Sequence, residues 1–503
     1  MNLNQSDRHL KSVVAGAVAL LLLWPSAVFA HSFGTVYSLP LPFWLYGWAA
    51  SAALLASFGV VAYLVRYGEA QAQPWSRDIS QSTALVLSRR LYLPNIARLL
   101  SVASLLLCIA TGLLGTKSSY GNFNMTFFWI IVMVGFAYLS ALVGNVFTLI
   151  NPYKVLCQWF QFLLPGYGRN TFSYPPQLAY WPALVFYFVF ITIELFANSG
   201  PYLLAVMLIS YGLINFVGVA FFGLKNWFHY ADFLSVFFRL IALMAPVNYV
   251  PAERGVAGEG RVHGVVKLRM PFSGLLSGTA EHFSLLVFVL FMLAATAFDG
   301  LHETLVWKQL FWRDMYLGFL QNYTDPNPFA AFRAMGDLYR YWQHLWLLLL
   351  PLLYLAIFMA VMALSKLLMR TSLPVSQLAL QMCYSLLPIT LVYHIAHYFT
   401  LLETQGIKII SLASDPFAWG HNWFGTAKWL QRMFIPDVTL TWYIQLAAII
   451  IGHIISVYIA HCVALRFADK GRRVIVSQLP MLMLMMAFTA SGLWILSRPV
   501  GGG

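Results

Sequence analysis

The chain has 503 residues, of which 60% are apolar and 9% are charged, and its mean hydropathy is +0.73. A soluble domain is about half apolar and about a quarter charged, so this composition excludes an ordinary soluble protein and indicates a polytopic membrane protein. The formal net charge of +13 does not indicate nucleic-acid binding, because basic residues in such chains mostly mark cytoplasmic loops. The four cysteines form no CxxC pair, so neither a disulfide framework nor a thiolate metal site is expected.

Residues 1–30 have the features of a secretory signal peptide. A basic segment precedes the apolar stretch 13–23, and Val28 and Ala30 are suitable small residues for a cleavage site after Ala30. An uncleaved first membrane anchor is the alternative. Cleavage would make His31 the N-terminus, where its amine and imidazole would form a bidentate copper ligand; otherwise His31 only caps a solvated end.

Ten apolar segments of the length needed to cross a bilayer follow. They are expected at about 43–65, 95–115, 127–150, 178–197, 201–223, 281–298, 344–366, 375–400, 441–465 and 478–497. Shorter amphipathic segments at 153–164, 226–246 and 305–320 are expected to form interfacial or re-entrant helices. No strand is apparent. The predicted fold is an all-α, polytopic membrane helical bundle of about ten spans, made by a single domain over residues 31–503.

The distribution of Lys and Arg predicts how these spans are oriented. If residue 31 lies outside, nineteen basic residues fall in inner loops and nine in outer loops. This bias follows the positive-inside rule and places both mature termini outside the cytoplasmic (inner) membrane of a bacterium. The two longest outer segments, 299–343 and 401–440, are expected to be functional loops.

Ionisable residues recur at the predicted outer ends of several spans. Such residues are costly in or beside a bilayer, so each is a candidate for function. The candidates are Glu194, Asp299, His302, Glu303, His394, His397, Glu403 and, about halfway along its span, His453. Histidines three residues apart share a helix face, and helical bundles hold metals with histidines and carboxylates that project inward. The topology therefore predicts one site near the outer face.

Nitrogen and oxygen ligands without thiolate suit a divalent zinc, iron, manganese or copper ion. We expect His394, His397 and Asp299 to be ligands, and a bound ion would lower the pKa of water for hydrolysis. Glu194, His302 and His453 would be further ligands or would contact the ligands. Glu303 or Glu403 would orient or deprotonate the attacking water. The structural alternatives are hydrogen bonds between spans for the histidines, a helix-end cap for Asp299 and His302, and a neutral or paired Glu194.

Short motifs in order along the chain carry a family resemblance. They are His31 followed by Leu39-Pro40-Leu41-Pro42-Phe43-Trp44-Leu45-Tyr46-Gly47-Trp48, then Phe298-Asp299-Gly300-Leu301, Ala396-His397-Tyr398-Phe399, Ser414-Asp415-Pro416-Phe417, Phe424-Gly425-Thr426-Ala427 and Gly452-His453. With these motifs the chain resembles the fenitrothion hydrolases, a family of polytopic bacterial membrane organophosphorus hydrolases. The resemblance implies cleavage of the P–O–aryl bond of phosphotriesters, and it assigns no catalytic residue. His302 departs from the family, where a small polar residue is expected, which weakens His302 as a ligand.

We therefore expect a membrane-bound phosphotriester hydrolase whose apolar substrate enters from the bilayer or the periplasm. Two other classes use the same residues differently. A permease or a metal-handling protein would use them for translocation or metal acquisition, and a non-catalytic subunit would need a second membrane subunit. A permease should have ionisable groups along a path to both faces. Beyond His453 and His461 the sequence offers few, which favours a site open to one face.

Overall fold

The computed structural model describes residues 42–65, 75–169, 172–197, 200–250, 265–325, 327–429, 437–467 and 472–498. The predicted signal peptide and His31 lie outside these ranges. Within them, nine helical segments are long and apolar enough to cross a membrane. The chain is thus a multi-pass membrane protein with a helical bundle.

The nine segments match nine of the ten predicted spans. They are α2 (Phe43–Leu64), α5 (Leu93–Leu114), the segment of α6 (Phe123–Met125), η1 (Thr126–Gly135) and α7 (Phe136–Val143), α11 (Pro201–Phe222), α14 (Phe283–His302), α16 (Pro328–Met369), the segment of α17 (Val375–Met382), η6 (Cys383–Leu386) and α18 (Leu387–Thr404), α20 (Val438–Ala464) and α21 (Arg472–Leu496). Of these, η1 is a π-helix and η6 is a 3-10 helix.

The predicted span 178–197 is shorter than expected. It forms α10 (Trp181–Phe196), whose 16 residues extend roughly 24 Å at the helical rise per residue. This is less than the roughly 30 Å of a hydrocarbon core. Pro182 in the first turn and the extended residue Ala197 set the two ends of α10. This helix reaches the site described below from its C-terminal end.

The amphipathic segment 226–246 does not lie on the surface. It contains the end of α12 (Leu224–Asn226), the π-helix η2 (Trp227–Ala231) and α13 (Phe233–Ala242), and all residues of α13 except Arg239 are buried. A helix that is buried on nearly all sides belongs in the interior of a bundle. The segment therefore lies inside the bundle in the structure.

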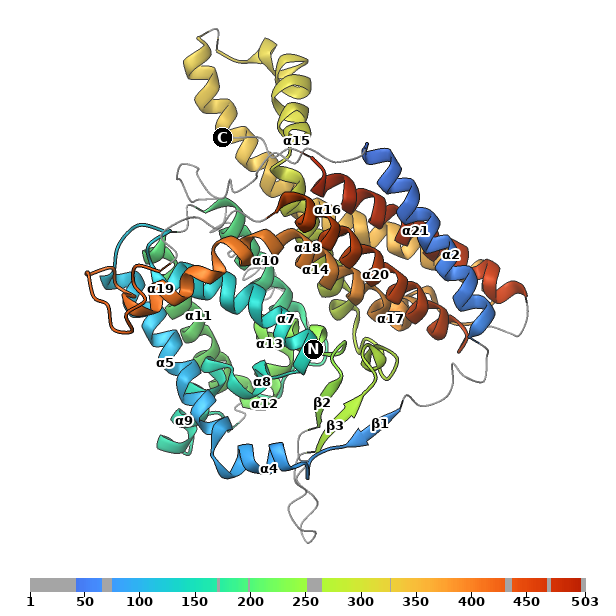
Figure 1. Cartoon of the computed structure of the whole chain (residues 1–503). Coiled ribbons are helices and arrows are strands. Elements are labelled where there is room, and N and C mark those ends of the chain that lie inside the picture. Colours follow the sequence, from blue (N-terminus) through green and yellow to red (C-terminus); the bar gives the residue numbers. More distant parts are fainter. Residues whose placement is uncertain are drawn as a thin grey trace, which may run out of the picture.

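The predicted outer segment 299–343 is largely helical. A short helix is predicted for its amphipathic part 305–320, whereas the early start of α16 is not predicted. The segment contains α15 (Leu305–Gln309), the π-helix η4 (Leu310–Leu317), the 3-10 helix η5 (Leu320–Tyr323) and the first turns of α16. Asn327 caps α16 through the Phe329 amide, so the helix begins well before its apolar part. Figure 1 shows this helical hairpin projecting from the bundle.

Three short strands form an antiparallel sheet that the sequence did not reveal. Strand β3 (Val265–Arg269) pairs on one side with β1 (Ser76–Asp78) and on the other with β2 (Val247–Val250). Ser76 pairs with Arg269, and Val247 pairs with Leu268. Segments of three to five residues carry too little alternation to be recognised, and β1 pairs with a strand nearly 200 positions away.

The remaining helices are short and connect the spans. They are α4 (Thr83–Arg90), α8 (Phe147–Ile150), α9 (Pro152–Leu163), the 3-10 helices η3 (Ser273–Leu275) and η7 (Gly406–Lys408), and α19 (Ile409–Ser414).

Helices α14 and α18 lie at the centre of the bundle. In Figure 1, α5, α7, α11 and α13 lie on one side of this pair, and α2, α20 and α21 lie on the other. Residues 284–298 of α14 are all buried, because its apolar residues cover every face of the helix. Thus the C-terminal ends of α14 and α18 are the parts of the central pair that carry ionisable residues.

A buried polar network fixes α13 within the bundle. Asp232 caps α13 by accepting from the Ser235 amide, and it also accepts from Asn151 Nδ2 at 2.9 Å and from the Tyr211 hydroxyl. Asn151 in turn caps α9. Asp232 is 0% exposed, so water could not replace it as the acceptor for these donors.

We expect Asp232→Ala to lower the stability of the protein by about 3 kcal/mol, because it leaves buried donors unpaired as well as removing a helix cap. Thermal unfolding of the purified protein in detergent measures the change. Asp437→Ala removes the exposed cap of α20 and should cost only about 1 kcal/mol. Equal losses in the two variants would contradict the role of the buried network.

Candidate functional site

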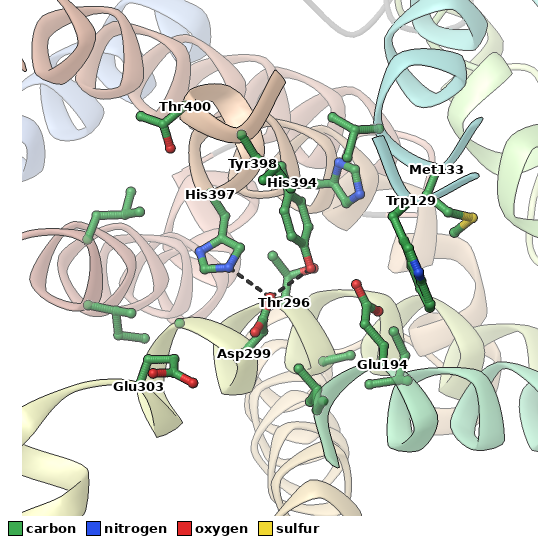
Figure 2. Close-up of a pocket in the computed structure, with 18 of the residues that line it drawn as sticks. Trp129, Met133, Glu194, Thr296, Asp299, Glu303, His394, His397, Tyr398 and Thr400 are labelled. Atoms are coloured by element: carbon green, nitrogen blue, oxygen red, sulfur yellow. Dashed lines mark hydrogen bonds and ion pairs between the residues drawn. The ribbon is translucent and has the colours of Figure 1, made fainter. Parts of the chain in front are cut away.

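A cavity of about 240 Å³ lies where the C-terminal ends of α10, α14, α18 and α21 meet η1. Its polar lining residues are Glu194, Thr296, Asp299, Glu303, Thr304, His394, His397, Tyr398, Thr400, Gln445 and Arg498. Its larger apolar lining residues include Trp129, Met133, Tyr187, Phe190 and Phe237. Figure 2 shows the polar and aromatic side chains facing each other across this space. Such a cavity suits a small molecule with both an apolar and a polar part.

Asp299 and His397 form the centre of the polar wall. Asp299 lies in the last turn of α14, and His397 lies on α18, which packs against α14. His397 Nε2 is 2.8 Å from Asp299 Oδ2 (Figure 2). Because the carboxylate accepts a hydrogen bond, this geometry favours the tautomer with the proton on Nε2 and the lone pair on Nδ1. The pair has the arrangement of a histidine base oriented by a carboxylate.

Tyr398 is a site residue that the sequence argument did not select. Its hydroxyl donates to Asp299 Oδ2 at 2.7 Å, so one carboxylate oxygen is shared by Tyr398 and His397. The tyrosine follows His397 directly and lies within one of the motifs of the family resemblance. Two adjacent residues of a helix reach the same carboxylate because Asp299 projects between them. Tyr398 therefore limits how Asp299 can rotate.

His394 and Glu194 also line the cavity, but they do not join this hydrogen-bonded group. His394 is 9% exposed, and within the described residues its Nδ1 has no hydrogen-bond partner. Its ring lies 4.8 Å from that of Tyr398. Figure 2 shows the Glu194 carboxylate projecting into the cavity from α10. A lone nitrogen and a carboxylate that face one space are available to a ligand.

His302 and Glu303 extend the polar wall towards the end of α14. His302 lies behind Asp299, with 3.5 Å from Nε2 to Asp299 Oδ1, and it does not line the cavity. Glu303 lines the cavity and ends α14; its Oε1 is 3.7 Å from His302 Nδ1, and its Oε2 is 3.8 Å from Lys308 Nζ. His302 thus contacts the site through Asp299 and Glu303 rather than directly.

The structure does not bring Glu403 or His453 to the cavity. Glu403 lies near the end of α18 and is not a lining residue. His453 is 1% exposed, and its Nδ1 is 2.8 Å from the Ile449 carbonyl oxygen of its own helix. The periodicity of a helix cannot reveal which face meets a cavity when neither its tilt nor its neighbours are known. His31 lies outside the described residues.

The aromatic wall includes residues of a π-helix that hydropathy could not predict. Trp129 and Met133 lie on η1, in the middle of an otherwise α-helical span, and both line the cavity. A π-helical segment shifts side chains around the helix axis and is frequent at functional sites. Trp129 also packs on Phe190 of α10, with ring centroids 5.2 Å apart. This contact closes the side of the cavity opposite Asp299.

Arg498 supplies a positive charge at the edge of the cavity. Its guanidinium lies over the Trp494 ring at 4.8 Å, and its Nε has no hydrogen-bond partner among the described residues. A guanidinium can bind phosphoryl or carboxylate oxygens through two N–H groups. The combination of a base, an apolar wall and a guanidinium suits an apolar substrate that carries one polar centre.

The donors at this site do not form the predicted metal centre as they are arranged. In the described part of the chain, no three or more His, Cys, Asp or Glu side chains are grouped so that they could hold a metal ion. Both oxygens of Asp299 already face other groups, Oδ2 towards His397 and Tyr398 and Oδ1 towards His302. An ion at Oδ2 would have to displace the hydrogen bonds from His397 and Tyr398. The divalent metal therefore stays a prediction.

The fold and the site define a class: a multi-pass helical membrane protein with a cavity of polar and aromatic residues at one end of the bundle. Comparison with protein-family models, with curated proteins and with solved structures finds no match.

We expect His394→Leu to raise the stability of the protein by about 1 kcal/mol. The substitution removes a buried nitrogen that has no hydrogen-bond partner in the described residues, and it places an apolar side chain beside the rings of Phe237 and Tyr398. Unfolding temperatures in detergent test this. His397→Leu is the matched comparison and should lower stability, because it leaves Asp299 without one donor. A loss of stability in His394→Leu would mean that His394 Nδ1 is satisfied in the protein.

Proposed function

We propose that the protein is a membrane-bound hydrolase of apolar phosphotriesters in which His397, oriented by Asp299, activates water. The observation that carries the proposal is the His397–Asp299 pair on the wall of a cavity whose opposite wall is aromatic. The resemblance to fenitrothion hydrolases supplies the substrate class. The proposal includes a bacterial inner-membrane location with the cavity towards the periplasm.

In this mechanism His397 Nδ1 accepts a proton from water as the water oxygen attacks phosphorus. Asp299 stabilises the imidazolium that forms, as a carboxylate does in histidine-dependent hydrolases. Gly300 keeps this side of the ring open: a Cβ there would lie 3.4 Å from His397 Nδ1. The P–O–aryl bond breaks and the aryloxide leaves with the electron pair. A nitrophenolate is a weak base, so it needs no general acid.

The surrounding residues support binding and charge stabilisation. The aryl ring would pack against Trp129 and Phe190, and Arg498 would attract the phosphoryl oxygen as negative charge develops there. An apolar triester partitions into the bilayer and would enter between helices near the end of the bundle. Glu303, held near Lys308 and His302, would contribute to the field at the water rather than act as the base.

We expect His397→Gln and Asp299→Asn each to lower the rate of nitrophenol release from a nitrophenyl phosphotriester by roughly 100-fold or more, because each disables the general base. Tyr398→Phe should cost less, about 10-fold, because Asp299 keeps its bond to His397. The assay uses purified protein in lipid nanodiscs at equal protein amounts.

His421→Gln is the control for these variants, because His421 lies in an exposed loop away from the cavity, and it should leave the rate unchanged. Undiminished hydrolysis in His397→Gln would overturn the site. A wild-type chain that binds the phosphotriester but hydrolyses it only when a second membrane subunit is added would favour the subunit alternative. Transport of the substrate without hydrolysis would favour a permease.

A separate experiment tests the metal. We expect hydrolysis to survive treatment with a chelator of divalent ions, because His397 and Asp299 supply the base and Asp299 Oδ2 already accepts from two side chains. Elemental analysis of the same sample accompanies the assay. Loss of activity that added zinc, iron, manganese or copper restores would show that a metal ion activates the water.

A further inference from the structure

A second, much smaller cavity lies at the opposite end of the bundle, and methionines dominate its lining. Its volume is about 20 Å³, enough for a single ion or water molecule. Five of its twelve lining residues are methionines: Met362, Met369, Met382, Met481 and Met485. They come from α16, α17 and α21, which pack against one another or against α20 (Figure 1). Three separate helices therefore bring thioether side chains to one point.

The spacing along the helices explains this convergence. Met362 and Met369 are seven residues apart and share a face of α16, while Met481 and Met485 are four apart and share a face of α21. All five methionines are at most 5% exposed. In contrast, Met483, between the two on α21, is 69% exposed and faces away from the bundle. Thus only the methionines on one face of α21 line the cavity.

Methionine often fills irregular gaps in a core, but apolar packing does not explain the polar atoms around this cavity. Ser365 and Gln478 line it and are 4% and 6% exposed. Neither Ser365 Oγ nor Gln478 Nε2 has a hydrogen-bond partner in the described ranges. Unpaired polar atoms in a membrane interior are costly, so their presence together indicates an occupant.

His461 does not line this cavity itself, but it contacts two residues that do, Gln478 and Phe58. Its Nδ1 is 2.7 Å from Gln478 Oε1, and its ring packs on that of Phe58, which lines the cavity. Since the amide oxygen accepts a hydrogen bond, the proton lies on Nδ1 and the lone pair on Nε2. No partner of Nε2 is found among the described residues. A histidine that donates through one nitrogen and offers the other is the form in which metals are bound.

We propose that the cluster of five methionines, together with the neighbouring His461, supplies the ligands of one Cu(I) ion, which would bind a subset of these six side chains. Thioether and imidazole ligands are soft and neutral, and among available cations they select Cu(I). The lining contains no carboxylate, which hard divalent ions would require. A monovalent ion on neutral ligands also brings the smallest charge into a membrane interior. The site shares no residue with the Asp299 cavity, so it stands whether or not the protein is a hydrolase.

The test measures Cu(I) binding to the purified full chain in lipid nanodiscs. Cu(I) is added under anaerobic conditions in competition with the chromogenic chelator bicinchoninate. Wild type should take up about one Cu(I) per chain. The double variant Met481→Leu/Met485→Leu should bind at least 10-fold more weakly, and Met483→Leu, on the exposed face of the same helix, should bind as wild type does. Leucine nearly conserves the volume of methionine, so the core should stay packed.

X-ray absorption at the copper edge gives an independent readout, with sulfur neighbours expected in wild type and fewer in the double variant. Met362→Leu on α16 provides a second variant if the double variant is unstable, and it should weaken binding in the same direction. Absence of Cu(I) uptake by wild type would overturn the proposal and leave a water molecule as the occupant. Equal affinity in wild type and in Met481→Leu/Met485→Leu would overturn it as well.

Discussion

The hydrogen bonds to Asp299 connect the two helices at the centre of the bundle. Its Oδ2 atom accepts from His397 and Tyr398, which connects the end of α14 to α18. A partly buried carboxylate is stabilised by such donors, so Asp299 on α14 must lie level with His397 and Tyr398 on α18. All three residues line the cavity.

The same constraint organises the rest of the membrane interior. Asp232 accepts hydrogen bonds that connect the start of α13 to Asn151 before α9. The hydrogen bond between His461 and Gln478 connects α20 to α21. Some of the buried atoms that have no partner in the described residues lie beside a cavity. His394 Nδ1 belongs to a residue that lines the Asp299 cavity, while Ser365 Oγ and Gln478 Nε2 belong to residues that line the methionine cavity. These two cavities lie at opposite ends of the bundle.

Much of the fold could be predicted from hydropathy, because a helix must present about twenty apolar residues to lipid. Nine of ten predicted spans have the required length, and only α10 is shorter. The sheet, the early start of α16 and the burial of α13 could not be predicted in this way. Each depends on contacts between distant segments or on caps such as Asn327. The π-helix η1 is equally invisible, since its residues have the same apolar character as an α-helical span.

The sequence by itself determined that the chain crosses a membrane many times and that Asp299 and His397 lie at span ends, because hydropathy and charge act on each residue locally. Only the tertiary structure decided which of the candidates meet. It joined Asp299 to His397 and Tyr398, put His302 behind them, and left Glu403 and His453 away from the cavity. The physical reason is that helix rotation, tilt and neighbours set these distances. These follow from the packing of the whole bundle rather than from the spacing along one helix.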